Sequence, residues 1–183
     1  AFYGCSLLKV VDLSGAAQTL SIGDYAFKEC SGLKEIKLPV KIRKIGNEAF
    51  RNCTTLTEVT IPSMTSTIGK YAFADCSNLT KLVYNGYKTL PEGAFANCVK
   101  LADVTLGNTV TSIGKETFKD CGEITSVVLP STLTTIGASA FANCTKLATV
   151  TLNSTKMPTI DGSSFANCVS LATLAANGAV FEN

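Results

Sequence analysis

Hydrophobic and polar residues alternate along this chain in a unit that recurs about every 23 residues. After each cysteine comes a leucine or isoleucine, then an alternating apolar–polar–apolar triplet, then Ile-Gly, then Ala-Phe-x-x-Cys. The clearest unit runs through Leu33, Ile36-Lys37-Leu38-Pro39, Ile45-Gly46 and Ala49-Phe50. The alternation predicts a short strand with one buried face, and the proline ends it because proline has no N–H to donate. The glycine after the core isoleucine suits a turn or a close approach to a neighbouring coil.

A phenylalanine stands three residues before each of the eight cysteines, and successive phenylalanines lie 25, 23, 23, 22, 23, 23 and 24 residues apart. A period of this length is typical of a solenoid, whose coils cannot bury their own apolar residues and therefore stack on one another. We expect the Ala-Phe-x-x-Cys segment to form a single helical or 3₁₀ turn that carries the phenylalanine into the core. The eight pairs are Phe2/Cys5, Phe27/Cys30, Phe50/Cys53, Phe73/Cys76, Phe95/Cys98, Phe118/Cys121, Phe141/Cys144 and Phe165/Cys168.

The fourth unit is the most irregular. Tyr84-Asn85-Gly86-Tyr87 follows its strand, and Leu90-Pro91 replaces Ile-Gly. We expect a local bend of the stack at this unit.

The pattern Leu-x-x-Ile-x-Leu-Pro…Ile-Gly-x-x-Ala-Phe-x-x-Cys resembles the BspA-like, or Treponema-type, leucine-rich repeat over almost the whole chain. The resemblance implies an α/β leucine-rich-repeat solenoid, shaped as a right-handed arc or horseshoe. Short parallel strands would line its concave face, and short helical or 3₁₀ turns its convex side. It also implies surface or secreted proteins of host-associated bacteria and mucosal protozoa, several of them adhesins for host matrix proteins. The family offers no catalytic residues to carry over.

Composition narrows the classes of function. The 183 residues carry 16 basic and 14 acidic side chains, a formal net charge of +2, spread along the chain. Nucleic acid is therefore not an expected partner, because its binding needs a basic stripe that releases counterions. No apolar run approaches the ~20 residues that span a bilayer. We expect residues 1–183 to form one repeat domain of about eight units that is a fragment of a longer array, and oligomeric state stays open.

The cysteines suggest metal binding or disulfides, but their spacing favours neither. Each coil supplies one cysteine and the chain has no histidine, whereas zinc sites need paired ligands. Stacked coils would place equivalent Cα atoms about 4.8 Å apart, yet their Cβ atoms would point in parallel, which does not suit a disulfide torsion. We predict a row of buried free thiols, with Cys5 and Cys168 in the end coils the most exposed. No cofactor is expected.

Two glutamates raise a catalytic alternative. Glu35 and Glu58 hold the same outward position in successive strands, which would place them about 5 Å apart, as in retaining glycosidases. A ladder of strands offers no cleft to desolvate an acid, so we interpret the pair as part of a solvated face. A calcium site built from Glu35, Glu58 and Asp103 would lack the six or more oxygens that this ion takes.

The concave face is the main candidate site, because its outward positions form two columns that could dock a protein. Thr and Val also favour strands in general, and this face lacks the Trp, Tyr and Arg anchors that are typical of binding hot spots. Tyr25, Tyr71 and Tyr87 are the few aromatic candidates elsewhere. The binding positions that we predict are Glu35, Lys37, Glu58, Thr60, Lys81, Val83, Asp103, Thr105, Val128 and Thr151.

The sequence thus predicts a non-enzymatic protein-interaction module. From the resemblance, the expected role is adhesion to host or matrix proteins at the cell surface or after secretion. An intracellular scaffold or signalling array is one alternative, since reduced thiols would suit it equally well. The other alternative is the targeting arm of a larger secreted enzyme.

Overall fold

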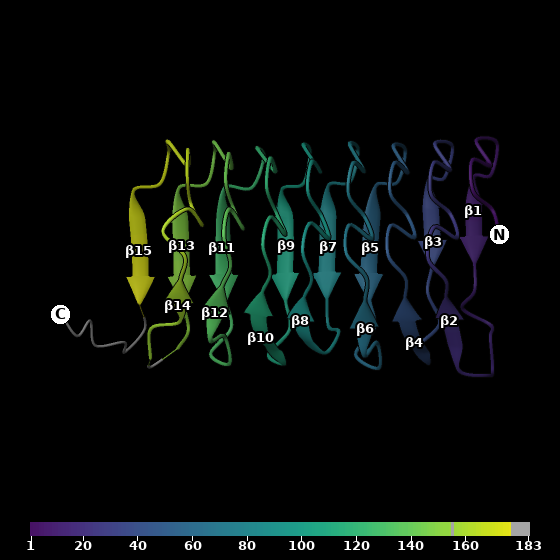
Figure 1. The fold of residues 1–183 in the computed structure, drawn as a ribbon, viewed down its shortest axis with the longest axis horizontal. Coiled ribbons are helices and arrows are strands. Elements are labelled where there is room, and N and C mark those ends of the chain that lie inside the picture. Colours follow the sequence, from purple (N-terminus) through teal and green to yellow (C-terminus); the bar gives the residue numbers. More distant parts are fainter. Residues whose placement is uncertain (155, 177–183) are drawn as a thin grey trace.

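The computed structural model describes residues 1–154 and 156–176, which form a stack of coils lying side by side along the long axis of the molecule (Figure 1). Each of the first seven coils contributes one odd-numbered and one even-numbered strand, and the described part of the last coil contributes β15. In Figure 1 the two kinds of strand point in opposite directions. The strand that the alternating triplet predicts is confirmed in every unit. The odd-numbered strands are β1 (Val10–Asp12), β3 (Glu35–Lys37), β5 (Glu58–Ile61), β7 (Lys81–Tyr84), β9 (Asp103–Leu106), β11 (Ser126–Leu129), β13 (Thr149–Leu152) and β15 (Thr173–Ala176).

A second strand per coil was not predicted. It ends at the isoleucine of Ile-Gly or its equivalent, and in three coils it is only two residues long, which is too short for periodicity to reveal. The even-numbered strands are β2 (Leu20–Ile22), β4 (Ile42–Ile45), β6 (Thr67–Ile68), β8 (Lys88–Leu90), β10 (Val110–Ile113), β12 (Thr135–Ile136) and β14 (Thr159–Ile160).

All strand pairs are parallel, and each joins equivalent positions of neighbouring coils. The odd-numbered strands form three sheets, β1-β3, β5-β7-β9 and β11-β13-β15, and the even-numbered strands form two, β2-β4-β6 and β8-β10-β12-β14. Each ladder is therefore interrupted, although β3 and β5 still lie next to each other, as do β9 and β11. The break between β6 and β8 falls at the irregular fourth unit.

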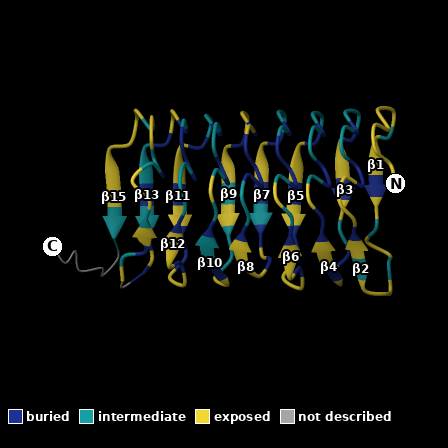
Figure 2. Cartoon of the chain, viewed as in Figure 1, coloured by how far each residue is buried: buried dark blue, intermediate teal, exposed yellow. Residues whose placement is uncertain are grey.

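The core is a row of like side chains. Figure 2 shows that buried residues recur in successive coils along the stack. Neighbouring phenylalanine rings stack from Phe2 to Phe165 with centroids 5.0 to 5.7 Å apart and interplanar angles of 3° to 21°. Tyr84 replaces an aliphatic residue in this core and is buried, with its hydroxyl donating to the Thr89 carbonyl at 3.1 Å.

The cysteines form a second row beside the rings. All eight are free, Cys5 is exposed, Cys168 is half-buried and the rest are buried, as the spacing predicted. From Cys30 onward, each thiol lies 2.9 to 3.3 Å from the carbonyl oxygen of the phenylalanine in the preceding coil. The thiol thus acts both as a small apolar side chain and as a donor that links successive coils.

The prediction of helical or 3₁₀ turns at Ala-Phe-x-x-Cys is wrong, and with it the α/β class: within the described residues the solenoid is built of strands and turns alone. The cause lies two residues before and two residues after each phenylalanine from Phe27 to Phe141, where the backbone is left-handed. In the third coil these are Tyr71 and Asp75, with φ of 56° and 62°, and left-handed residues at that interval interrupt any right-handed helix. Instead, alternate N–H groups point along the stack: Phe73 donates to the Ala94 carbonyl and Asp75 to the Ala96 carbonyl, each at 2.8 Å.

The prediction of tight packing at Ile-Gly is confirmed. A Cβ atom at Gly46 or Gly69 would overlap the backbone of the preceding coil, around Asp24 and Asn47 respectively. Gly23 occupies the same motif one coil earlier, and a Cβ there would meet nothing within 4 Å. The glycine therefore serves the contact between coils rather than the turn itself.

Candidate protein-binding surface

The outward side chains of the odd-numbered strands, which we call the odd-strand face, correspond to the predicted concave face. Strand register places the predicted residues in two columns, because equivalent positions pair from coil to coil. The pairs include Glu58 with Lys81, Lys81 with Asp103, Thr60 with Val83, Val83 with Thr105 and Val128 with Thr151. Val83 and Thr151 are half-buried, and the other eight predicted residues are exposed.

The first part of the odd-strand face is charged. Glu35 and Lys37 pair with Val10 and Asp12 of the first coil, and the Lys37 ammonium lies 3.3 Å from Glu35 and 3.6 Å from Asp12. These carboxylates raise the pKa of Lys37, with the hydrogen bond to Glu35 as the largest cause. Val10 and Asp12 were missed as members of the face, although the buried Val11 between them marks both as outward.

The middle part combines one charged column with one neutral column. Lys81 lies between Glu58 and Asp103, with its ammonium 3.8 Å from the Asp103 carboxylate. This arrangement also bears on the calcium hypothesis, because a cation already occupies the position between two of the three proposed ligands. No group of three or more histidine, cysteine or acidic residues placed to hold a metal ion occurs among the described residues.

The last part of the odd-strand face is neutral. Val128 is 52% exposed and pairs with Thr151, while Ser126 pairs with Thr149. Because this part has no charge to orient a partner, any contact there depends on shape and on apolar and hydroxyl groups.

The break between β3 and β5 separates the two predicted neighbours Glu35 and Glu58. The predicted spacing of about 5 Å assumed a ladder across these strands, and the structure has none there. A shallow open groove of about 810 Å³ lies at the break, lined by residues of both strands that include Lys37 and Thr60. Both carboxylates are exposed, and an open groove does not enclose a substrate as an active site does.

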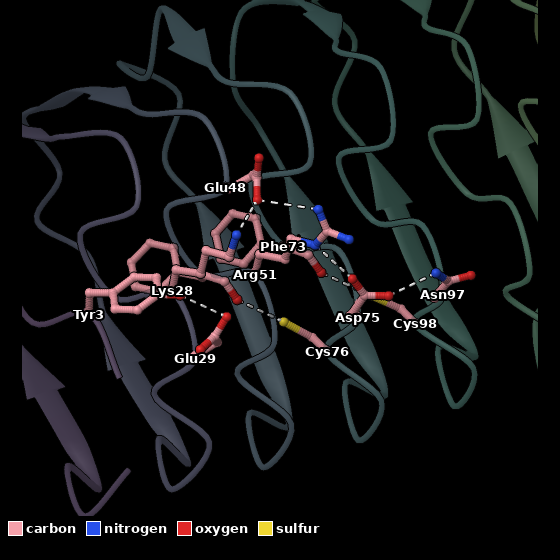
Figure 3. Close-up of polar contacts among 11 residues, drawn as sticks. Tyr3, Lys28, Glu29, Glu48, Arg51, Phe73, Asp75, Cys76, Asn97 and Cys98 are labelled. Atoms are coloured by element: carbon pink, nitrogen blue, oxygen red, sulfur yellow. Dashed lines mark hydrogen bonds and ion pairs between the residues drawn. The ribbon is translucent and has the colours of Figure 1, made fainter. Parts of the chain in front are cut away.

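Charged residues on the turns between the even-numbered and odd-numbered strands are mutually satisfied. Figure 3 shows a continuous chain of contacts from Lys28 to Glu48, Arg51, Asp75 and Asn97. Glu48 accepts from Lys28 at 2.8 Å and from Arg51 at 3.2 Å, and Asp75 accepts from Arg51 at 2.8 Å and from Asn97 at 2.7 Å. The hydrogen bond from Lys28 is the largest cause of a lowered pKa of Glu48. We interpret this chain as a link between coils, since its charges already have partners.

The tyrosines proposed as anchors lie outside the odd-strand face. Tyr25 and Tyr71 belong to the turns, where the cations of Lys28 and Arg51 lie 5.4 and 5.8 Å from the respective ring centroids. Tyr87 is 50% exposed and precedes β8 on the other side of the coil.

Comparison with known proteins identifies the family of this chain. A model of the BspA type leucine rich repeat region, in 6 copies, matches residues 1–123 and 83–182. The chain belongs to this family. Leucine-rich repeats of this family are protein-interaction modules, and the match indicates no catalytic family.

Solved structures agree with this assignment. A leucine-rich repeat protein from Bacteroides ovatus superposes with a TM-score of 0.66 at 25% identity, covering 97% of this chain and 57% of that one. The T. pallidum leucine rich repeat protein gives a TM-score of 0.67 at 29% identity, covering 85% of this chain and 73% of that one. This chain thus spans little more than half the length of the Bacteroides ovatus protein.

No curated protein matches the chain. Within residues 1–154 and 156–176, no helix has the length and apolar character needed to cross a membrane.

Proposed function

We propose that this BspA-type repeat binds a partner protein through its odd-strand face and serves adhesion at a cell surface or after secretion. The observation that carries the proposal is the strand register, which aligns outward side chains within each of the three odd-numbered sheets. These sheets lie next to one another along the stack, and we call their combined outward surface the platform. The expected partner is an extracellular-matrix or other host surface protein, as the resemblance implies.

The distribution of charge along the platform supports an oriented complex. Ion pairs around Lys37 and Lys81 mark one half, whereas Ser, Thr and Val make up the outward positions from β11 to β13. Charged groups at one end of an interface fix orientation and accelerate association, and neutral groups at the other end contribute buried area.

A charge swap on the platform tests the proposal. A binding screen against extracellular-matrix and plasma proteins supplies the partner, and its affinity is then measured for E58K/K81E. The swap preserves net charge but reverses the local field, so we expect affinity to fall about tenfold or more.

The matched control is E123K/K146E. This pair lies on the loops before β11 and β13, with side chains 45% and 57% exposed and a 2.7 Å ion pair, and its swap should leave affinity within about twofold. Unchanged affinity for E58K/K81E, in a variant that keeps the circular dichroism of the wild type, would show that the odd-strand face is not the site.

The two alternatives are separated by the complete reading frame. A signal peptide with an anchor supports adhesion, whereas the absence of both supports an intracellular scaffold. An appended globular domain with candidate catalytic residues supports the targeting arm of a secreted enzyme.

A further inference from the structure

A different face of the solenoid carries cations that have no carboxylate partner. The outward side chains of β4 and β8 include Arg43, Lys44 and Lys88, all exposed, and within the described part of the chain none of them forms an ion pair. Hydrogen bonds from Asn47, and to a smaller extent the charge of Lys44, lower the pKa of the Asp24 carboxyl. This carboxylate forms no ion pair with Lys44 and already accepts from the Asn47 backbone N–H at 2.9 Å. On the odd-strand face, by contrast, the lysines are ion-paired.

A trough runs between these cations. Two adjoining depressions of about 390 and 290 Å³ share Ser66 and Tyr87 as lining residues. Arg43 and Met64 line the first, and Lys88 lines the second. The half-exposed Tyr87 ring and the 36% exposed Met64 give the trough an apolar wall, which distinguishes it from a purely charged surface.

The trough lies where the ladder between coils is broken, between β6 and β8 (Figure 1). At the Ile-Gly position, Gly69 donates to the carbonyl of Ile45 at 2.8 Å and Gly114 to that of Leu90 at 2.8 Å. Pro91 holds this position in the coil between them and has no N–H, so the carbonyl of Ile68 lacks this bond. The N–H of Thr89 turns back to the Tyr87 carbonyl at 2.7 Å, which removes another donor from the ladder.

The charge is confined to a short stretch of this face. Beyond β8 the outward residues of the even-numbered strands are hydroxyl-bearing, as at Thr111, Ser112 and Thr135. A long polyanion such as nucleic acid needs a longer basic stripe. A short peptide with a few carboxylates and apolar side chains fits both the charge and the apolar wall.

We propose that this trough is a second docking site, separate from the odd-strand face, for an acidic extended segment of another protein. Arg43 and Lys88 lie two coils apart, across the broken ladder between β6 and β8, and each lines one of the two depressions. On a polyproline II segment every third residue projects to the same side, at intervals of about 9 Å, so one segment can present carboxylates to both cations. Such a segment places carboxylates on Arg43 and Lys88 and an apolar residue against Tyr87. Its main-chain N–H groups can donate to carbonyls at the broken ladder.

The test uses a fluorescein-labelled (Glu-Leu-Pro)₄ peptide and fluorescence anisotropy with the whole chain. The peptide should bind saturably, and R43E/K88E should weaken binding about twentyfold or more. The matched control K34E/K100E changes net charge equally through exposed lysines elsewhere and should weaken binding less than about threefold. Y87A should weaken binding about fivefold, whereas Y25A, which removes a comparably exposed ring from the turns, should leave it unchanged.

Three results would overturn the inference. The first is no saturation by (Glu-Leu-Pro)₄ up to about 2 mM in low salt, where charge attraction is strongest. The second is an equal loss in the two double variants, which would mean attraction by net charge alone. The third is tighter binding of a sulfated polysaccharide or duplex DNA that Y87A does not weaken, which would identify a polyanion site. If R43E/K88E does not fold, R43Q/K88Q replaces it, and the charge swap E58K/K81E should leave peptide binding intact.

Discussion

The cysteine residue defines the chemistry of this solenoid at the smallest scale. Its thiol is buried against stacked rings and donates to a carbonyl one coil away, so it joins apolar packing to a directional bond. Burial raises the pKa of the Cys53 and Cys144 thiols to about 12. The six buried cysteines are therefore structural and unreactive in the folded state, whereas Cys5 is exposed and Cys168 is half-buried.

The thiols predict a specific loss of stability in alkali. A thiol whose pKa is about 12 when folded and near its ordinary value of 9.0 when unfolded stabilises the fold below pH 9. The folded state then holds more protons than the unfolded state between these values, so stability falls as pH rises by about 1.4 kcal/mol per pH unit per thiol. Urea unfolding at several pH values between 9 and 11 measures this slope.

The matched variants for this measurement are C53A/C144A and I136V. We expect the slope of unfolding free energy against pH to become shallower by about 2.8 kcal/mol per pH unit in C53A/C144A. I136V should keep the slope of the wild type because it removes buried apolar volume and no titratable group. Equal slopes in all three proteins would contradict a raised thiol pKa.

At the scale of the element, the turn and the Ile-Gly corner decide how closely coils approach. We predict that Gly69→Ala destabilises the protein by about 2–4 kcal/mol, because the new Cβ atom must displace the backbone at Asn47. Gly23→Ala places the same methyl group in the same motif but in open space. It should change stability by less than about 1 kcal/mol, and chemical denaturation of both variants makes the comparison. Similar losses in the two would show that the glycine is needed for backbone conformation instead.

At the scale of the whole molecule, stability should spread along the stack from nearest-neighbour contacts. Phe95 packs between Phe73 and Phe118 with centroids 5.5 and 5.7 Å away, whereas Phe2 is 50% exposed at one end. Phe95→Ala should therefore cost about 3–5 kcal/mol, and Phe2→Ala about 1 kcal/mol or less.

Hydrogen exchange measured by mass spectrometry shows which coils each of these two substitutions destabilises. F95A should lose protection most in peptides of β7 to β10, and F2A only around β1 to β3. A uniform loss of protection from end to end in F2A would mean that the stack unfolds as one cooperative unit, contrary to the nearest-neighbour description.

The repeat itself could be predicted from the sequence because its signal is repeated and local. The Phe/Cys spacing established the solenoid, and the alternation at Ile36-Lys37-Leu38 identified both the strand and its outward residues. The free, buried thiols could also be predicted, because one cysteine per coil does not suit a metal site or a disulfide. Val10 and Asp12 could have been added to the face by the same alternation in the first unit.

Tertiary structure alone decided how the coils join. The turns are not helical because left-handed residues such as Tyr71 and Asp75 direct N–H groups to the next coil, and no local pattern distinguishes that from a single 3₁₀ turn. The break of the odd-strand ladder separates Glu35 from Glu58. The uncompensated cations beside Tyr87 likewise come from different coils. Residues far apart in sequence become neighbours only through the stacking of coils, so which charges are paired and which stay free is a property of the fold.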